Sequence, residues 1–202
     1  MSVRPMGVGT AAIAASGNGL IAADAPAFPQ VVTVTVPTQS PSIGSLVQGA
    51  GLSQAGTISL QVVAPAGGRT MTLTSNDPSR LLLAPDATTL GAPQINLTFA
   101  AGTYYASFIL MSPEMVAGSV SLTISTPDYR DTTVTLTVVQ PAVALSGPQP
   151  TRTLAQGDDW FVAQVGVPSG SGVLAQTVRF GAPAPLDVTL SSSAPAIGTL
   201  VI

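Results

Sequence analysis

Apolar and polar residues alternate with a period of two along most of this chain. Residues 57–62 read Thr-Ile-Ser-Leu-Gln-Val, an order that places Ile58, Leu60 and Val62 on one face of an extended strand. Val, Ile, Leu and Thr carry the pattern, and Gly, Pro, Ser and Asn interrupt it about every 8–12 residues. Because the chain also contains 18 prolines, it leaves little room for long helices. The pattern predicts an all-β fold of short strands.

The expected strands fall into two groups, one before and one after Pro141. The first group comprises residues 44–52, 57–64, 71–75, 81–84, 94–99, 103–111, 119–125 and 132–139. The second comprises residues 142–146, 160–167, 175–180, 187–192 and 198–202. Alternation within these strands predicts a buried core formed by Ile58, Leu60, Val62, Leu73, Leu97, Leu122, Ile124, Val134 and Leu136.

Two stretches near the amino end repeat the two stretches that close the first group of strands. Residues 9–16 read GTAAIAAS and match residues 118–125, which read GSVSLTIS. Residues 31–37 read VVTVTVP and match residues 133–139, which read TVTLTVV. Both pairs have the form of the last two strands of an immunoglobulin-like sandwich.

A second internal echo marks the middle of a domain: MTLTSNDPSRLLL at 71–83 matches VTLSSSAPAIGTLVI at 188–202. The echoes predict three regions. Residues 1–37 form the last strands of an Ig-like domain, and residues 38–140 form a complete Ig-like β-sandwich. Residues 141–202 form the first strands of a second such domain, which residues 1–37 of a neighbouring or preceding unit would complete.

Longer segments resemble a known family. The run GTISLQVVAPAGGRTMTLTSNDPSRLLLAP, followed by GAPQINLTFAAGTYYASFIL and AGSVSLTIS, resembles tandem bacterial Ig-like repeats of large secreted or surface-attached proteins. LAQTVRFGAPAPLDVTLSSSAPAIGTLV resembles a second repeat type that alternates with the first. The resemblance implies tandem sandwiches with an extracellular structural or adhesive role, and it supplies no catalytic residue. One departure is the segment 18–30, which is longer than its counterpart 126–131 and predicts an extended loop.

Composition excludes several kinds of chemistry. Lysine, histidine and cysteine are absent, and only 7% of the residues are charged, with a formal net charge of −3. The chain therefore has no histidine or lysine base, no thiol nucleophile, no zinc ligand set and no disulfide. We expect no enzymatic activity and no cofactor. A net-negative chain without an arginine cluster also predicts no binding to nucleic acid.

The apolar stretch 7–23 is the longest candidate for a membrane or signal segment. Ser16-Gly17-Asn18-Gly19 interrupts it, and it falls short of the roughly 18 uninterrupted apolar residues of a membrane helix. Arg4 and an alanine-rich centre also fit a signal peptide. The internal echo favours a strand, so we expect no membrane insertion.

Asp158 and Asp159 form the only adjacent acidic pair and are the weak candidates for a calcium site. Calcium needs six to eight oxygen ligands, which Asp187, Asp128 or Asp131 would have to help supply. No loop has the spacing of a calcium-binding motif, and Asp is common in turns for backbone capping alone. We therefore expect a solvated turn and no metal.

Aromatic residues gather at two places, Tyr104 to Phe108 and Trp160-Phe161. Alternation places Tyr104 and Phe108 on one face, predicted to be the core, and Tyr105 on the other. Tyr105 and Trp160 are the candidates for exposed aromatic side chains that stack on a sugar ring or fill an interface.

Together these features predict a structural building block of a bacterial extracellular filament or surface repeat array. Its subunits would join by β-strand complementation into a homo-oligomer or filament, with a glycan or a cell surface as a further partner. The residues expected to form the assembly contact are Ile13, Val32, Val34, Val36, Val188, Leu190 and Leu200. The alternatives are an adhesin or carbohydrate-binding sandwich, and a phage or virion decoration protein.

Overall fold

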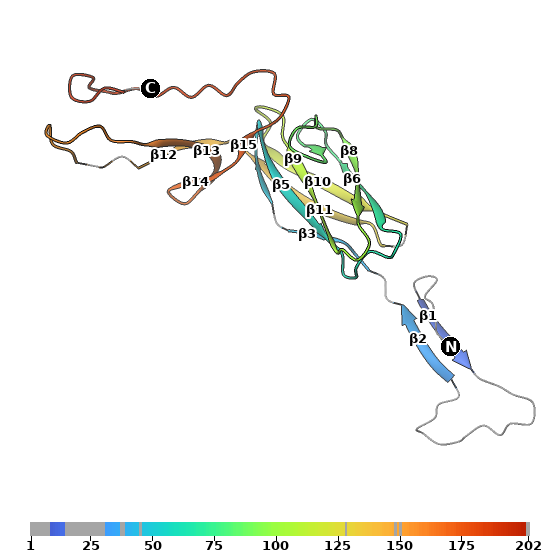
Figure 1. The fold of residues 1–202 in the computed structure, drawn as a ribbon. Coiled ribbons are helices and arrows are strands. Elements are labelled where there is room, and N and C mark those ends of the chain that lie inside the picture. Colours follow the sequence, from blue (N-terminus) through green and yellow to red (C-terminus); the bar gives the residue numbers. More distant parts are fainter. Residues whose placement is uncertain are drawn as a thin grey trace, which may run out of the picture.

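A computed structural model describes residues 9–14, 31–36, 39–44, 46–127, 129–147, 149 and 151–200. Every regular element in these residues is a β-strand (Figure 1). The all-β prediction is therefore confirmed. The strands are β1 (Gly9–Ala14), β2 (Val31–Val36), β3 (Ser42–Ile43), β4 (Val47–Gly49), β5 (Leu52–Ser59), β6 (Arg69–Ser75), β7 (Leu82–Ala84), β8 (Gln94–Phe99), β9 (Tyr105–Met111), β10 (Gly118–Ser125), β11 (Thr132–Val139), β12 (Ala142–Ser146), β13 (Val162–Ser169), β14 (Gly172–Ala175) and β15 (Thr177–Val178).

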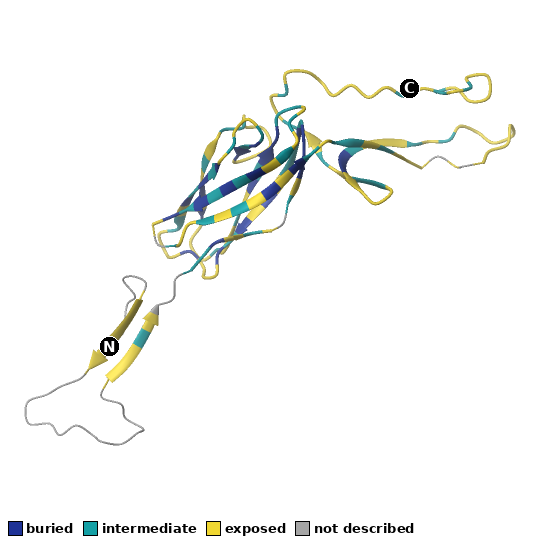
Figure 2. Cartoon of the chain, turned by 180° about the vertical axis from the view of Figure 1, so that it is seen from behind, coloured by how far each residue is buried: buried dark blue, intermediate teal, exposed yellow. Residues whose placement is uncertain are grey.

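The central strands form two sheets that pack face to face. One sheet has the order β4-β11-β10-β6-β8, and the other has the order β15-β5-β9-β7 with β3 also paired to β5. All neighbours are antiparallel except β4 and β11, which run parallel. Figure 2 shows the buried residues concentrated between these two layers.

One continuous apolar core fills the space between the layers, and it includes the rings of Phe99 and Phe108. Seven of the nine predicted core residues are buried: Ile58, Leu60, Leu73, Leu97, Leu122, Ile124 and Leu136. Six of these side chains come from β5, β6, β8, β10 and β11, as a two-layer sandwich requires, and Leu60 directly follows β5.

The other two core predictions differ from the structure. Val62 is about half exposed, because β5 ends at Ser59 and the chain then bends. The amide of Leu60 donates to the Tyr104 carbonyl at 2.7 Å, but the ladder does not continue to Val62. Val134 is half-buried on β11. Tyr104 precedes β9 and is exposed, so its predicted place in the core with Phe108 is also wrong.

The strand prediction for residues 44–52 also needs correction. A turn at Ala50-Gly51 divides this stretch into β4 and the start of β5. Gly51 has a φ of 75°, a backbone conformation that glycine adopts more readily than other residues. The turn allows the chain to pass from one sheet to the other.

The remaining strands lie outside this sandwich (Figure 1). β1 and β2 form a two-stranded sheet, and β12, β13 and β14 form a three-stranded one. Residues 187–192 and 198–200 have no strand pairing, so the strands predicted there are wrong for the described residues. The predicted loop at 18–30 lies outside the described residues.

Candidate functional site

The β1–β2 hairpin exposes an apolar face. Ile13 lies opposite Val32, and Ala11 lies opposite Val34, so these four side chains share one side of the two-stranded sheet. Ile13 is 40% exposed and Val32 is 52% exposed. An isolated two-stranded hairpin is at best marginally stable in water. This hairpin therefore has the composition of an inner sandwich face without an opposing layer.

The same hairpin has the strand register of β10–β11. Gly9 pairs with Val36 in the first hairpin, and Gly118 pairs with Val138 in the second. The φ angle is 139° at Gly9 and 137° at Gly118. With this register Ile13 corresponds to Leu122, which lies in the core of the central sandwich. The two hairpins thus share pairing and backbone, and they differ in whether a sandwich covers them.

The three-stranded sheet β12–β14 is also open. Val143 and Leu145 on β12 and Leu174 on β14 are exposed. After β15 the chain turns back and runs beside this sheet, as Figures 1 and 2 show from opposite sides. Between the two lies a groove of about 470 Å³, lined by Gln140, Pro141, Ala142, Val143, Leu145, Val165, Leu186, Asp187, Val188, Thr189 and Leu190.

β13 resembles β5 in sequence. β5 reads LSQAGTIS and β13 reads VAQVGVPS, which share glutamine, glycine and serine at the same spacing. β13 is flanked by β12 and β14, as β5 is flanked by β3 and β9. β14 follows β13 directly in a hairpin, whereas β6, β7 and β8 separate β5 from β9 in the chain, so the likeness is confined to the sequence of the strand and its central place in a sheet.

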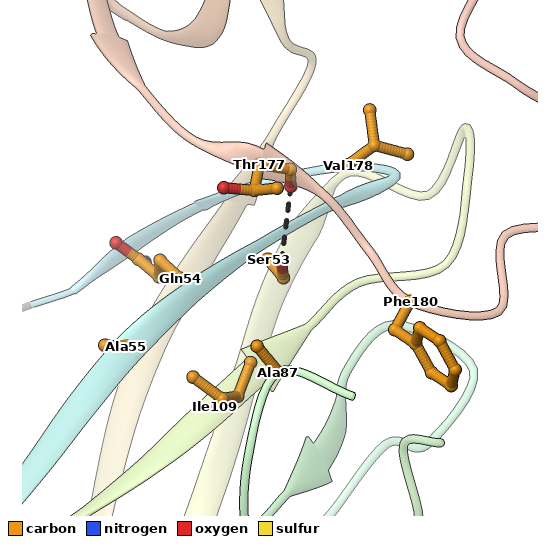
Figure 3. Close-up of a pocket in the computed structure, with 8 residues that line it drawn as sticks. All are labelled: Ser53, Gln54, Ala55, Ala87, Ile109, Thr177, Val178 and Phe180. Carbon is orange, nitrogen blue, oxygen red and sulfur yellow. Dashed lines mark hydrogen bonds between the residues drawn. The ribbon is translucent and has the colours of Figure 1, made fainter. Parts of the chain in front are cut away.

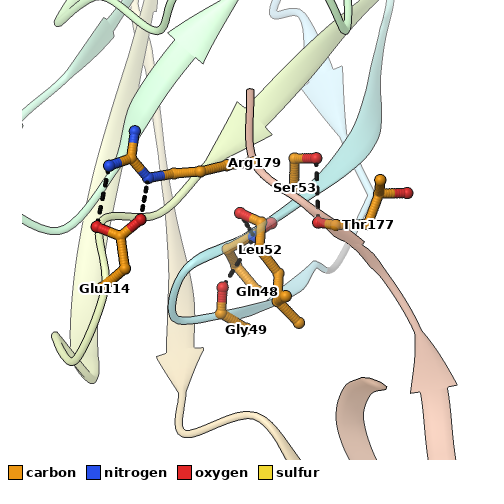
Figure 4. A network of polar contacts seen from close by, with 7 residues as sticks. All are labelled: Gln48, Gly49, Leu52, Ser53, Glu114, Thr177 and Arg179. Atoms are coloured by element: carbon orange, nitrogen blue, oxygen red, sulfur yellow. Dashed lines mark hydrogen bonds and ion pairs between the residues drawn. The ribbon is translucent and has the colours of Figure 1, made fainter. Parts of the chain in front are cut away.

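A junction holds this carboxy-terminal region to the central sandwich. β15 pairs antiparallel with the first residues of β5 (Figure 4). The side-chain amide of Gln176 accepts from the Gly49 amide at 2.8 Å and donates to the Val47 carbonyl at 2.9 Å. Arg179 donates two hydrogen bonds to the Glu114 carboxylate, at 2.8 and 2.9 Å. These hydrogen bonds lower the pKa of Glu114 below its usual value.

A second hollow of about 210 Å³ lies beside β15 (Figure 3). Its lining combines aliphatic side chains with Ser53, Gln54, Thr177 and Phe180, and it contains no acidic or basic group. The Ser53 hydroxyl donates to the Thr177 carbonyl at 3.3 Å. This hydrogen bond joins β5 to β15 at the edge of the hollow. Its composition offers contacts for an apolar side chain and no acid or base.

Of the two calcium candidates, Asp159 has protein partners. Asp159 accepts from the Gln149 amide at 2.6 Å and lies 3.6 Å from Arg152. Asp158 is exposed. Within the described residues, no group of three or more acidic side chains is placed to hold a metal ion. The structure thus gives Asp159 the capping role of a turn residue.

The two aromatic residues predicted to be exposed, Tyr105 and Trp160, lie far apart. Tyr105 is 57% exposed and pairs with Ser59 at the last residue of β5. Trp160 is 86% exposed and precedes β13, in the region that joins the sandwich at the first residues of β5. They form no common row of the kind that stacks on a glycan. Tyr105 instead contacts Tyr104 edge to face, with ring centroids 5.3 Å apart.

The residues predicted for assembly occur in two places. Ile13, Val32 and Val34 lie on the apolar face of the hairpin. Val188 and Leu190 line the groove, and Leu200 is half-buried in the segment that follows. Val36 pairs with Gly9, but its side chain lies outside the described residues. Sequence reasoning missed the junction formed by Gln176, Arg179 and Glu114.

Comparison of the sequence with protein-family models and with curated proteins gives no match. Among the described residues, no helix is long and apolar enough to cross a membrane. Functional inference therefore depends on the geometry of this chain.

Proposed function

We propose that this protein is a structural building block of a bacterial extracellular filament or surface repeat array. Its Ig-like units would join when the β1–β2 hairpin of one copy fills the groove of another. One observation carries the proposal: the hairpin has the register of β10–β11 but lacks the sandwich that covers β10–β11. The resemblance to bacterial Ig-like repeats supports the extracellular setting.

The groove supplies the complementary half. Its lining includes Val143, Leu145 and Val165 from the sheet and Val188 and Leu190 from the returning segment. The strands of the hairpin carry no charged residue, and the groove carries only Asp187. Binding of the hairpin in the groove therefore removes few charges from water. Full burial of one Val or Ile side chain is worth about 1.5–3 kcal/mol. Several such side chains offset part of the entropic cost of association.

The two halves lie at opposite ends of the central sandwich (Figure 1). β3, which follows the hairpin, pairs with the last residues of β5, whereas β15 pairs with its first residues. The eight residues of β5 separate these points by about 23 Å. A second copy is therefore the better donor for the groove. A contact between different surfaces is heterologous, so it propagates into a filament with a defined polarity.

The test compares two variants of the full chain by sedimentation velocity and negative-stain electron microscopy. Ile13→Asp places a charge on the apolar face, and Ala12→Asp places the same charge on the opposite face of the same strand. We expect the wild type and Ala12→Asp to form filaments at high concentration and Ile13→Asp to remain monomeric. A wild-type chain that stays monomeric, or an Ile13→Asp chain that assembles normally, contradicts the proposal.

A further inference from the structure

The central sandwich provides a template for the pairing between copies. There β10 lies between β11 and β6, and the β10–β6 ladder is antiparallel. Leu122 is opposite Ser75, and Thr123 is opposite Thr74. β1, the counterpart of β10, pairs with β2 on one side, and its other edge carries no partner strand among the described residues. That free edge is the one that β10 presents to β6.

Residues 188–192 are the counterpart of β6. VTLSS at 188–192 aligns with MTLTS at 71–75, where Met71 and Leu73 are buried. Val188 and Leu190 occupy the same alternate positions and line the groove that faces β12–β13. Within the described chain, residues 187–191 make no backbone hydrogen bond to another segment. The segment therefore has the apolar face and the unpaired backbone of a strand without its neighbour.

Resting on the proposed function, we infer that β1 of one copy adds antiparallel to residues 188–192 of the next, with Ile13 opposite Ser192 and Ala14 opposite Ser191. Gly9 corresponds to Gly118, and Val188 corresponds to Met71. The register of the β10–β6 ladder therefore applies to the contact between copies without a shift. The pair Leu122 and Ser75 corresponds to the pair Ile13 and Ser192. A slip by one residue would turn Ile13 away from the groove.

Within the hairpin, β1 is the strand that pairs with residues 188–192. β2 corresponds to β11, which pairs with β10 and with β4 but not with β6. β2 therefore packs over the sheet β12–β13 through Val32 and Val34 and leaves the pairing with residues 188–192 to β1. Amide groups of both partners gain ladder hydrogen bonds, and alternate side chains enter the groove.

Because the chain has no cysteine, single-cysteine variants can report this register directly. Ala14→Cys protein is mixed with Ser191→Cys protein under mild oxidation, and the linked heterodimer is measured on non-reducing gels. Directly opposite residues place their Cβ atoms about 4.5–5.5 Å apart, which is close to disulfide geometry. Ser193→Cys is the matched control, since it lies about 7 Å further along the same face. All three positions are exposed, so each variant should fold.

We expect Ala14→Cys to link to Ser191→Cys about tenfold faster than to Ser193→Cys. If wild-type protein assembles but Ala14→Cys links faster to Ser193→Cys, or to neither, the register is overturned and the proposed function stands. If wild-type protein is monomeric and no heterodimer forms, the proposed function fails and the register fails with it. Linkage within single molecules of an Ala14→Cys/Ser191→Cys chain at high dilution overturns the role of a second copy.

Discussion

Arg179 clamps Glu114 through two parallel hydrogen bonds, 2.8 and 2.9 Å long, between residues 65 positions apart. The pair joins the segment after β15 to the loop between β9 and β10. The Arg179 side chain is 13% exposed and the Glu114 side chain is 37% exposed. Solvent therefore partly screens the ion pair between Arg179 and Glu114. The pair lies close to the point where β15 joins the sheet that contains β5.

The first prediction is that this junction weakens in acid. Hydrogen bonding from Arg179 lowers the pKa of Glu114 from its usual 4.5. A lowered pKa in the folded state stabilises the fold fully above pH 4.5, and this contribution is lost as the pH falls through the folded-state pKa. Because the Glu114 side chain is more than a third exposed, solvent screens the ion pair. We expect the pair to contribute about 0.5 kcal/mol to the free energy of unfolding. Carbon-13 NMR of the carboxyl group should give a midpoint below 4.5.

The matched variant is Glu114→Gln, which keeps the shape but cannot titrate. It should be less stable than wild type at pH 7 and should lack this component of the acid transition. A titration midpoint of the Glu114 carboxyl group at or above its usual pKa would contradict the hydrogen bonding between Arg179 and Glu114.

The second prediction concerns the release of β15. Gln176 is hydrogen-bonded to β4 through Val47 and Gly49, and Arg179 is bonded to Glu114. Gln176→Ala combined with Arg179→Ala removes both side-chain anchors. It leaves the short β15–β5 ladder, the bond from the residue 179 amide to the Gly51 carbonyl and the bond from the Ser53 hydroxyl to the Thr177 carbonyl. We expect limited proteolysis to cut after residue 175 several-fold faster, while the central core stays protected. Equal cleavage rates in variant and wild type would show that the two side chains do not hold β15.

The third prediction concerns the core. Leu122 is fully buried on β10, and Leu122→Ala should destabilise the sandwich by about 2–5 kcal/mol in chemical denaturation. Thr135→Ala, at an exposed position on the neighbouring strand, should change the free energy of unfolding by about 0.5 kcal/mol or less. Similar losses for both variants would contradict the burial of Leu122 in the core.

Strand alternation in the central region predicts the fold closely, because each of these strands has its pairing partner within the chain. Residues 94–99, 132–139 and 142–146 are strands with the predicted bounds. The prediction for Val62 fails because alternation does not indicate where a strand bends out of its ladder. The prediction of one strand over residues 44–52 also fails: Leu46 and Val47 are adjacent apolar residues that interrupt the alternation, and the chain turns at Ala50-Gly51.

At the candidate site the strand predicted over residues 187–192 has no pairing among the described residues. Residues 187–192 have a strand pattern, but a strand forms only when another backbone satisfies its hydrogen bonds. The junction was not predictable from periodicity, because Gln176 and Arg179 act across more than 60 positions on Val47, Gly49 and Glu114. Only the scarcity of charge in the chain draws attention to Glu114 and Arg179 as a potential pair.

The fourth prediction is that removing divalent ions leaves stability unchanged. Asp159 is already paired with the Gln149 amide and with Arg152. A calcium site of even moderate affinity would contribute about 2.7 kcal/mol at a hundredfold excess over its dissociation constant. Thermal unfolding should therefore give the same Tm in chelator and in calcium. A large drop in chelator that Asp159→Asn abolishes would show a site at this pair.

The last prediction concerns the close packing of the Phe108 ring against Gly56. A Cβ atom added at Gly56 would lie 2.6 Å from Cζ of Phe108, which is fully buried on the paired strand β9. Gly56→Ala should therefore force the ring to move and cost about 1–3 kcal/mol. Phe108→Leu alone leaves a gap and should also destabilise the sandwich. The double variant lets the new methyl group occupy part of that gap, so its loss should be smaller than the sum of the two single losses by about 1 kcal/mol. Denaturant unfolding of the four proteins measures this coupling directly. Additive losses would mean that the ring does not pack against the Gly56 backbone, and that the absence of a side chain in the middle of β5 has another cause.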